Sequence, residues 1–221
     1  MEDVLVSWSG GKDSCLALYE LQRARRHRVA ALLTTVTEDY DRVQMHGVRR
    51  ELLERQAASL GLPLRQVLIP KGATNEEYER AMAEDFSEYR EQGIDSVVFG
   101  DLFLEDVRAY REQFLARHGM RGLYPVWKRD TGEFVREFIA LGFKAVVTCV
   151  SSEALDGSFA GRLIDKEFLA SLPPRVDPCG ENGEFHTFVY DGPSFKGEVR
   201  FTVGEKVLRD PFWFCDLRPE R

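Results

Sequence analysis

A glycine pair, a lysine and several hydroxyl side chains crowd into SWSGGKDSC, residues 7–15. The apolar run Val4–Val6 leads into this segment, and an amphipathic helical pattern follows it. Glycines after a strand let the backbone approach a ligand closely. A helix N-terminus offers free N–H groups and a partial positive charge. A lysine there is well placed only when an anion binds, so the segment predicts a polyphosphate site.

A second polar group lies near the C-terminus, in CGENGEFHT, residues 179–187. It combines carboxylates, an amide and an imidazole. If Glu184, His186 and Phe188 continue into a strand, their side chains share one face. Glu184 would then lie beside His186 and could tune the imidazole for proton transfer. The alternative is a polar hairpin whose histidine faces solvent.

The first half of the chain predicts the elements that position these groups. Strands are expected at 4–8, 29–36, 66–69 and 96–99, and helices at 13–26, 48–60, 74–92 and 105–118. This alternation predicts a parallel, doubly wound sheet. Ligands bind at the carboxyl ends of such strands. Gly100 and Asp101 follow the fourth strand, so we expect them in the same crevice as SGGKDS, with Asp101 either capping a helix or holding a metal.

The pattern changes after Trp127. Helices are expected at 134–141 and 166–172, and strands at 145–150, 198–203 and 212–217, which indicates a smaller α+β lobe. The aromatic run at 211–214 suits a core or a homo-oligomer interface. The helical stripe of Tyr78, Met82, Phe86 and Tyr89 predicts core packing.

Composition narrows the class of protein. Of 221 residues, 43% are hydrophobic, which is enough for a sizeable core. The net charge of -7 argues against a general surface for duplex nucleic acid. The four cysteines are far apart, so a zinc ribbon or a redox pair is not expected. We find neither a signal-peptide pattern nor a membrane-spanning apolar run, and therefore expect a cytoplasmic protein with no membrane contact.

SGGKDS is neither the P-loop nor the dinucleotide fingerprint; it resembles the PP-loop of the N-type ATP pyrophosphatases. With QMHGVRRELLERQAASLGLPL, GDLFLEDVRAYREQFLARHGMRGLYPVW and CGENGEFHTFVYDGPSF, nearly the whole chain is similar to the diphthine–ammonia ligase family and its bacterial relatives. The resemblance implies an α/β fold with a Rossmann-like sheet of the adenine nucleotide alpha hydrolase type. Residues 1–125 would form the PP-loop ATP-binding domain, and 126–221 a C-terminal substrate-binding lobe.

The resemblance also implies site residues. ATP would be bound by the loop, the second strand end, the start of the second helix and the fourth strand end: Ser9, Gly10, Gly11, Lys12, Asp13, Ser14, Thr34, Thr35, Met45, His46 and Gly100. Asp13 and Asp101 would hold Mg²⁺. The catalytic residues would be Lys12, Asp101, Glu184 and His186. The substrate would contact Glu181, Asn182, Gly183, Glu184 and Thr187.

The implied reaction is an ATP-dependent ligation. A carboxylate, small or protein-borne, is adenylated with release of pyrophosphate, and ammonia or an amine then forms an amide. We recognise no glutaminase region, so the nitrogen donor is open. In diphthamide-forming members the late loop reads G-E-G-G-E-[FY]-E-[TS], whereas this chain has Asn182 and His186, as the bacterial branch does. The acyl substrate therefore stays open, and the alternatives are a tRNA-modifying PP-loop enzyme or a non-catalytic ATP/AMP sensor.

Overall fold

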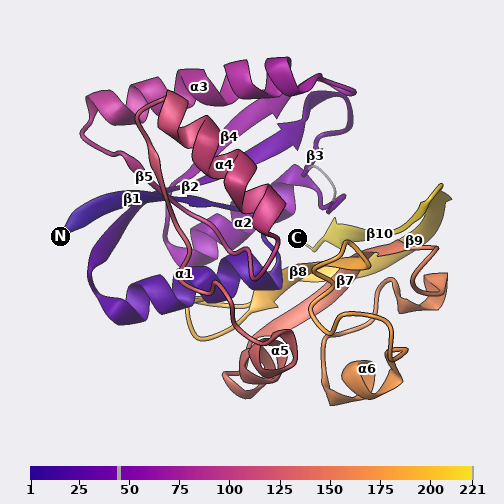
Figure 1. The fold of residues 1–221 in the computed structure, drawn as a ribbon. Coiled ribbons are helices and arrows are strands. Elements are labelled where there is room, and N and C mark those ends of the chain that lie inside the picture. Colours follow the sequence, from indigo (N-terminus) through magenta and orange to yellow (C-terminus); the bar gives the residue numbers. More distant parts are fainter. Residues whose placement is uncertain (44–45, 221) are drawn as a thin grey trace.

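The computed structural model of the protein describes residues 1–43 and 46–220 (Figure 1). Its larger sheet holds five parallel strands: β1 (Glu2–Ser7), β2 (His27–Thr37), β4 (Leu64–Ile69), β5 (Ser96–Val98) and β6 (Arg121–Leu123). The strands lie in the order β4-β2-β1-β5-β6, so the chain changes direction across the sheet between β1 and β5. This is the topological switch point at which α/β sheets bind ligands.

Two strands of this sheet were not predicted. β6 has three residues and β3 (Arg42–Val43) has two, which is too short for a readable period. β3 pairs antiparallel with the end of β2, after the 3₁₀ helix η1 (Glu38–Tyr40).

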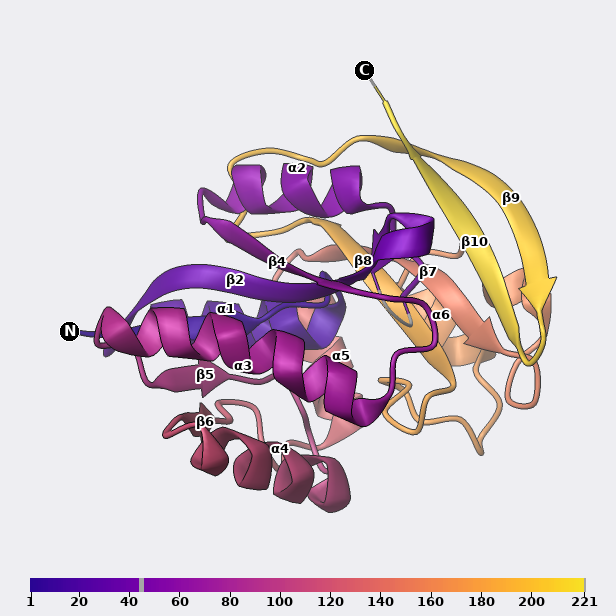
Figure 2. The ribbon, with the colours of Figure 1, turned by 90° about the horizontal axis from the view of Figure 1, so that it is seen from above.

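Helices cover both faces of the sheet, as Figure 2 shows from above. α1 (Lys12–Ala24) and α2 (Arg50–Leu60) bury leucines against Val4, Val6 and Leu32. α3 (Asn75–Glu91) and α4 (Glu105–Arg117) pack on the other face. Thr74 and Glu77 form a capping box at the start of α3.

The remainder forms a smaller α+β unit. β7 (Lys144–Ser151), β8 (Phe185–Asp191), β9 (Phe201–Arg209) and β10 (Phe212–Pro219) make an antiparallel sheet in the order β8-β7-β10-β9. The helices α5 (Thr131–Ala140) and α6 (Lys166–Ser171) and the 3₁₀ helix η2 (Gly157–Phe159) belong to the same unit. The predicted α/β class with a smaller α+β lobe is confirmed.

The two sheets share one hydrophobic cluster, in which Val4 and Leu53 of the first lobe join Phe185 and Phe188 of β8. The predicted boundary at residue 125 stays a prediction, because the core is continuous across it. Among the described residues, no helix combines the length and the apolar character that crossing a membrane requires.

Candidate active site

The turn between β1 and α1, residues 8–14, is called the phosphate loop below. Gly10 adopts a positive φ of 76°, and a Cβ there would lie 2.7 Å from Leu53 Cδ1 and 2.8 Å from Gln56 Oε1. Only glycine both adopts this positive φ without strain and leaves room for the two neighbouring side chains. Gly11 is the N-cap of α1 and has no side-chain cap, so Asp13 is not the capping residue. The hydroxyls of Ser9 and Ser14 lie 3.3 Å apart beside this turn.

Lys12 is buried, with 2% of its surface exposed. The ammonium lies 3.0 Å from Asp13 Oδ2 and above the ring of Phe185, 5.6 Å from its centroid. Burial, the largest single effect, lowers the pKa of Lys12, but the charges of neighbouring acidic groups and the hydrogen bond to Asp13 together outweigh it, and the net pKa is raised. Lys12 is therefore a fixed positive charge in the wall of the site. This lysine at a helix start is thus enclosed rather than exposed to solvent.

Strand β8 of the second lobe braces the phosphate loop. The Lys12 N–H donates to Thr187 Oγ1 at 3.1 Å, and the Val189 N–H donates to the Gly10 carbonyl at 2.9 Å. Thr187, predicted to contact substrate, thus holds the loop itself. These contacts bring the SGGKDS and GENGEFHT segments together.

Gln56 is a site residue that the sequence reasoning missed. It is fully buried on α2, accepts from Trp8 Nε1 at 2.8 Å, and donates to the carbonyls of Gly10 at 3.0 Å and Val189 at 2.6 Å. The signal was present, because Gln56 falls on the same helical face as Leu53 and Leu60. A polar side chain on a buried face requires partners of its own.

The end of β5 lies against the first turn of α1. A Cβ at Gly100 would be 2.7 Å from the carbonyl carbon of Asp13 and 2.8 Å from the Ser14 nitrogen, so glycine allows the approach. Asp101 faces the same crevice and forms an ion pair with Arg111. Burial raises the pKa of Asp101, and the charge of Arg111 opposes that rise. The predicted meeting of Gly100 and Asp101 with the phosphate loop is observed.

The acid-rich loop before β8, residues 177–184, is stabilised by Glu184. Its carboxylate accepts from the backbone N–H groups of Asp177 at 3.0 Å and Asn182 at 2.9 Å, and from Asn182 Nδ2 at 3.1 Å. Glu184 precedes β8 and its carboxylate is turned into its own loop. The expected pairing of Glu184 with His186 on one strand face is therefore wrong, because the donors of the loop already hold this carboxylate.

His186 instead lies against His46, with ring centroids 4.7 Å apart. His46 Nδ1 lies 3.1 Å from the Thr187 carbonyl, which can only accept, so this nitrogen carries the proton. His186 Nε2 is buried and has no hydrogen-bond partner among the described residues. Burial, and then the neighbouring His46 and Lys12, lower the pKa of His186 to about 3. The imidazole is consequently neutral near pH 7.

These groups line a cavity of about 370 Å³. Its wall includes Glu181, whose pKa is raised to about 7 by burial and then by Asp13. The hydroxyl of Thr34 is buried without a partner among the described residues. An unpaired hydroxyl and an unpaired imidazole nitrogen on one cavity fit a polar ligand.

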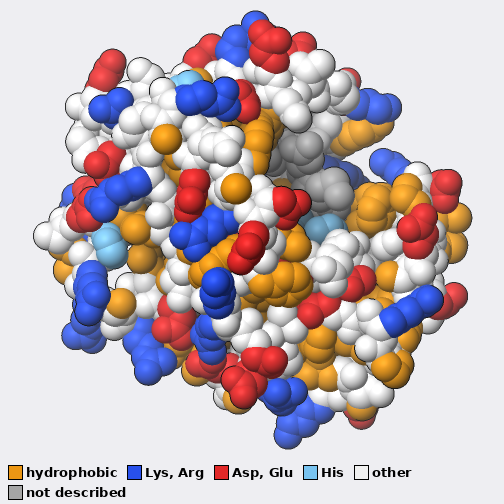
Figure 3. All heavy atoms as spheres, in the orientation of Figure 1, with side chains coloured by type: hydrophobic (Ala, Val, Ile, Leu, Met, Phe, Trp, Pro, Cys, Tyr) orange, Lys and Arg blue, Asp and Glu red, His pale blue; other side chains and the backbone are white. Residues whose placement is uncertain are grey.

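The predicted residues that line this cavity come from both lobes. They are Ser9, Lys12, Asp13, Ser14, Thr34, Thr35, His46, Gly100, Asp101, Glu181, Gly183, His186 and Thr187. The described lining does not include Gly10, Gly11, Asn182 or Glu184. Met45 lies outside the described residues. In the space-filling view the surface is hollowed between the two lobes, where basic, acidic and apolar side chains meet (Figure 3).

A divalent cation fits the donor set of the cavity. Asp13 Oδ1 lies 2.9 Å from the Lys12 ammonium yet has no hydrogen bond, and the Asp101 carboxylate lines the same wall. The described residues contain no group of three or more His, Cys, Asp or Glu suited to a metal ion. Mg²⁺ is commonly held by one or two carboxylates together with substrate phosphates. Asp13 and Asp101 would supply the one or two carboxylates that this mode of Mg²⁺ binding needs.

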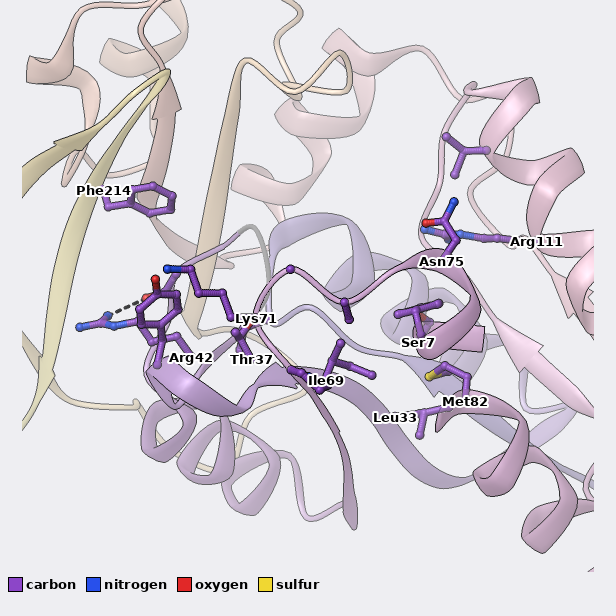
Figure 4. Close-up of a pocket in the computed structure, with 18 of the residues that line it drawn as sticks. Ser7, Leu33, Thr37, Arg42, Ile69, Lys71, Asn75, Met82, Arg111 and Phe214 are labelled. Atoms are coloured by element: carbon purple, nitrogen blue, oxygen red, sulfur yellow. Dashed lines mark hydrogen bonds between the residues drawn. The ribbon is translucent and has the colours of Figure 1, made fainter. Parts of the chain in front are cut away.

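A second and larger cavity, of about 900 Å³, adjoins the first. Figure 4 shows part of its lining. The two share Ser7, Leu33, Val43, Tyr78, Met82 and Arg111. The predicted core stripe on α3 therefore does two things: Met82 and Phe86 are buried, and with Tyr78 they also form a cavity wall.

Comparison with known proteins agrees with this arrangement. Residues 2–122 match a family model described as the diphthamide synthase N-terminal domain, and residues 130–218 match its C-terminal domain. Proteins named diphthine–ammonia ligase are similar over 95% of this chain. The one from Danio rerio is 26% identical, with 90% of its length covered, and those from Mus musculus and Homo sapiens are 27% and 24% identical, each with 86% covered.

A solved structure, titled a predicted subunit of a tRNA methyltransferase from Methanocaldococcus jannaschii, is similar over 89% of this chain and 100% of that one. Its TM-score is 0.42 and its sequence identity 16%. Both halves of the chain, by contrast, match one family in the expected order, and together they supply the two walls of the site. The chain therefore belongs to the diphthamide synthase family and is an ATP-dependent, amide-forming ligase.

Proposed function

We propose that the protein adenylates a carboxylate with ATP, releases pyrophosphate, and passes the acyl group to ammonia or an amine. The observation that carries this proposal is the buried Lys12 ammonium, fixed between the phosphate loop and the carboxylates of the smaller cavity. A buried cation beside a glycine turn and a helix N-terminus suits the charge of a polyphosphate. The family matches favour this ligase over the tRNA-modifying enzyme and the sensor that the sequence left open.

Lys12 and the phosphate loop would stabilise the charge that builds on the departing pyrophosphate. Bound Mg²⁺, held by Asp13 and Asp101, would neutralise further phosphate charge. Thr34, Thr35 and His46 would face the nucleoside. The buried Thr34 hydroxyl and His186 Nε2 would gain their missing partners from the ligand.

His186 would act on the second half-reaction. A neutral imidazole with a free nitrogen can accept a hydrogen bond from an attacking amine and so orient it toward the acyl carbon. Glu181, Gly183 and Thr187 line the same wall and would contact the substrate. For Glu184 and Asn182 we propose a supporting role in this step, since together they hold the acid-rich loop that presents Glu181.

The curated relatives are named for diphthine and ammonia. For this chain we propose ammonia or a small amine as the nitrogen donor, and a small or protein-borne carboxylic acid as the acyl substrate. Such a reaction, supplied by cellular ATP, suits a cytoplasmic enzyme.

The test uses hydroxylamine as a general nucleophile. The purified protein is incubated with ATP, Mg²⁺, hydroxylamine and a panel of carboxylic acids, and AMP, ADP, pyrophosphate and hydroxamate are measured together. AMP, pyrophosphate and hydroxamate should form in equal amounts. ADP and phosphate as the products would overturn the proposal.

Lys12→Met is the informative variant, with Lys166→Met as its matched control at the exposed start of α6. Lys12→Met should lose turnover by roughly 10²-fold or more, the size typical of a lost charge-stabilising group. Lys166→Met should keep it. Circular dichroism of both variants establishes that the comparison is made between folded proteins.

A further inference from the structure

The larger cavity has one end at the nucleotide site. Arg111 on α4 belongs to the lining of both cavities, forms the ion pair with Asp101, and stacks on Phe99 at 4.5 Å from the ring centroid. Its guanidinium is therefore held at the junction. A carboxylate that binds Arg111 lies next to the space in which the phosphates would bind.

The other end carries a second positive group, made by Lys71 and Arg209. The Lys71 ammonium lies 5.0 Å from the ring centroid of Tyr40, and the Arg209 guanidinium lies 5.5 Å from the same centroid. One tyrosine ring thus holds a lysine from the loop after β4 together with an arginine from the end of β9. In Figure 4, Lys71 and Arg111 lie on opposite sides of the pocket.

Within residues 1–43 and 46–220, no ion pair is formed by Lys71 or by Arg209. Asp39 accepts the backbone N–H of Lys71 at 2.8 Å rather than its ammonium. Of the other charges on this lining, Arg42 and Asp216 are paired with each other, and Glu205 of β9 is a carboxylate that forms no ion pair among the described residues. Lys71 and Arg209, both exposed at this end of the cavity, therefore have no carboxylate partner among the described residues and can take an anion.

Between its charged ends the cavity is apolar. Ile69, Met82, Phe86, Phe114 and Leu115 contribute to the wall. An occupant that matches this pattern carries negative charge at both ends and hydrocarbon between them.

We propose that the larger cavity binds the acyl substrate, and that this substrate is a carboxylic acid with a second anionic group at its far end. The reacting carboxylate lies at Arg111 and the second anion lies between Lys71 and Arg209. The inference rests on the proposed function, because it places the substrate of that reaction. It also excludes an acid whose far end is positively charged, such as a quaternary ammonium group.

A quaternary ammonium group requires free aromatic faces and no neighbouring cation. The aromatic rings at the two charged ends of the cavity already hold cations: Tyr40 has Lys71 and Arg209, and Phe99 has Arg111. A trimethylammonium group would meet like charge at either end. The electrostatics of the cavity thus reject that substrate class.

The test measures binding of stable acyl-adenylate mimics, so it requires no knowledge of the natural substrate. Acylsulfamates of adenosine are made with a terminal carboxylate (succinyl to suberyl), with the neutral acyl chains of matching length, and with a trimethylammoniobutyryl chain. Dissociation constants are measured by calorimetry for the parent, for Lys71→Gln/Arg209→Gln, and for Lys206→Gln. Lys206 is the control, because it lies on β9 outside the described lining of the cavity.

The best diacid mimic should bind the parent roughly tenfold or more tightly than its neutral match, as one charge-assisted contact implies. The double variant should lose that preference and keep its affinity for the neutral mimics, and Lys206→Gln should behave as the parent. Equal affinity for diacid and neutral mimics, or a preference for the trimethylammonium mimic, would overturn the inference. If the neutral mimics still bind more tightly than AMP, the proposed function stands even when the inference fails. If no mimic binds more tightly than AMP, the proposed function and the inference both fail.

Discussion

The backbone N–H of Lys12 donates to the hydroxyl of Thr187, 3.1 Å away and 175 positions later in the chain. Both partners are buried. The first turn of α1 therefore takes its position from a strand of the other lobe.

Removing this hydroxyl should affect stability and catalysis together. Thr187→Val keeps the shape of the side chain but leaves the Lys12 N–H without an acceptor, which costs about 1–3 kcal/mol. We expect a lower urea midpoint and a weaker affinity for ATP. Thr187→Ser restores the hydroxyl and should recover most of both. A valine variant with parental ATP affinity would show that the loop holds its position without β8.

The Gln56 network should contribute more to stability than any single surface bond. Gln56→Leu removes the partners of Trp8 Nε1 and of two carbonyls, and we expect a loss of about 2–4 kcal/mol in the free energy of unfolding. Gln92→Leu, at the exposed end of α3, should stay within about 0.5 kcal/mol of the parent. Chemical denaturation of the two variants measures the difference, and equal losses would contradict the prediction.

Gly100→Ala should displace the end of β5 from α1. The new Cβ would meet backbone atoms of Asp13 and Ser14 at 2.7–2.8 Å, and overpacking of this kind costs about 1–3 kcal/mol. We also expect weaker ATP binding, since the phosphate loop must shift. Gly197→Ala is the control, because a Cβ there meets nothing within 4 Å. Calorimetric ATP titrations of both variants measure this affinity. Equal ATP affinities in the two variants would contradict the prediction.

His186 should make stability fall in mild acid. Its pKa in the folded protein is lowered to about 3, whereas an unfolded histidine titrates near 6.5, so below that pH the unfolded chain binds the extra proton. The free energy of unfolding should therefore drop by up to about 1.4 kcal/mol per pH unit below pH 6.5. His46, whose pKa is also lowered by burial, adds to this slope in the parent.

Urea titrations between pH 7 and pH 5 test this slope. His186→Gln should show a shallower slope than the parent, and an identical slope would mean that the imidazole is solvated. The same shift means that His186 should not produce a limb near pH 6.5 in the pH–rate profile, contrary to what its ordinary pKa suggests.

Asp216 should stabilise the junction between β10 and the first lobe at neutral pH. Hydrogen bonds from Arg49, and then from Arg42, hold the pKa of this carboxyl well below its usual range, and its side chain is 17% exposed. A lowered pKa means that the contribution is complete above the unfolded value of about 3.9 and is lost as the pH falls toward the folded value.

Asp216→Asn should therefore cost about 1–3 kcal/mol at pH 7. The gap between variant and parent should narrow below about pH 4, as the parent's carboxyl also becomes protonated. Glu198→Gln, an exposed acid without an ion pair among the described residues, is the control and should change little. A gap that stays constant with pH would show that the carboxylate charge is not the source of the stabilisation.

The sequence predicted the parallel sheet and the glycine turn after its first strand because local signals specify them. Glycines after a strand, a capping box and helical periods are all readable within a few residues of one another. It also predicted that Gly100 and Asp101 face the loop, since parallel strands bring their carboxyl ends to one edge.

What it missed depends on contacts between distant segments. Thr187 as a brace, Gln56 as a buried hub and the His46–His186 stack each join segments far apart in the chain. The pairing of Glu184 with His186 failed because strand period says nothing about where β8 begins. The low pKa of His186 depends on burial by residues from two lobes, which no local pattern records.

The bracing of the phosphate loop by β8 has a consequence for the protein while it is being made. Translation delivers Gly10, Gly11 and Lys12 early, but the hydrogen-bond partner of Lys12, Thr187, follows only 175 positions later. A nascent chain can assemble the parallel sheet before then, yet it lacks the far wall of the ATP site. The candidate site is thus complete only after β8 has been synthesised.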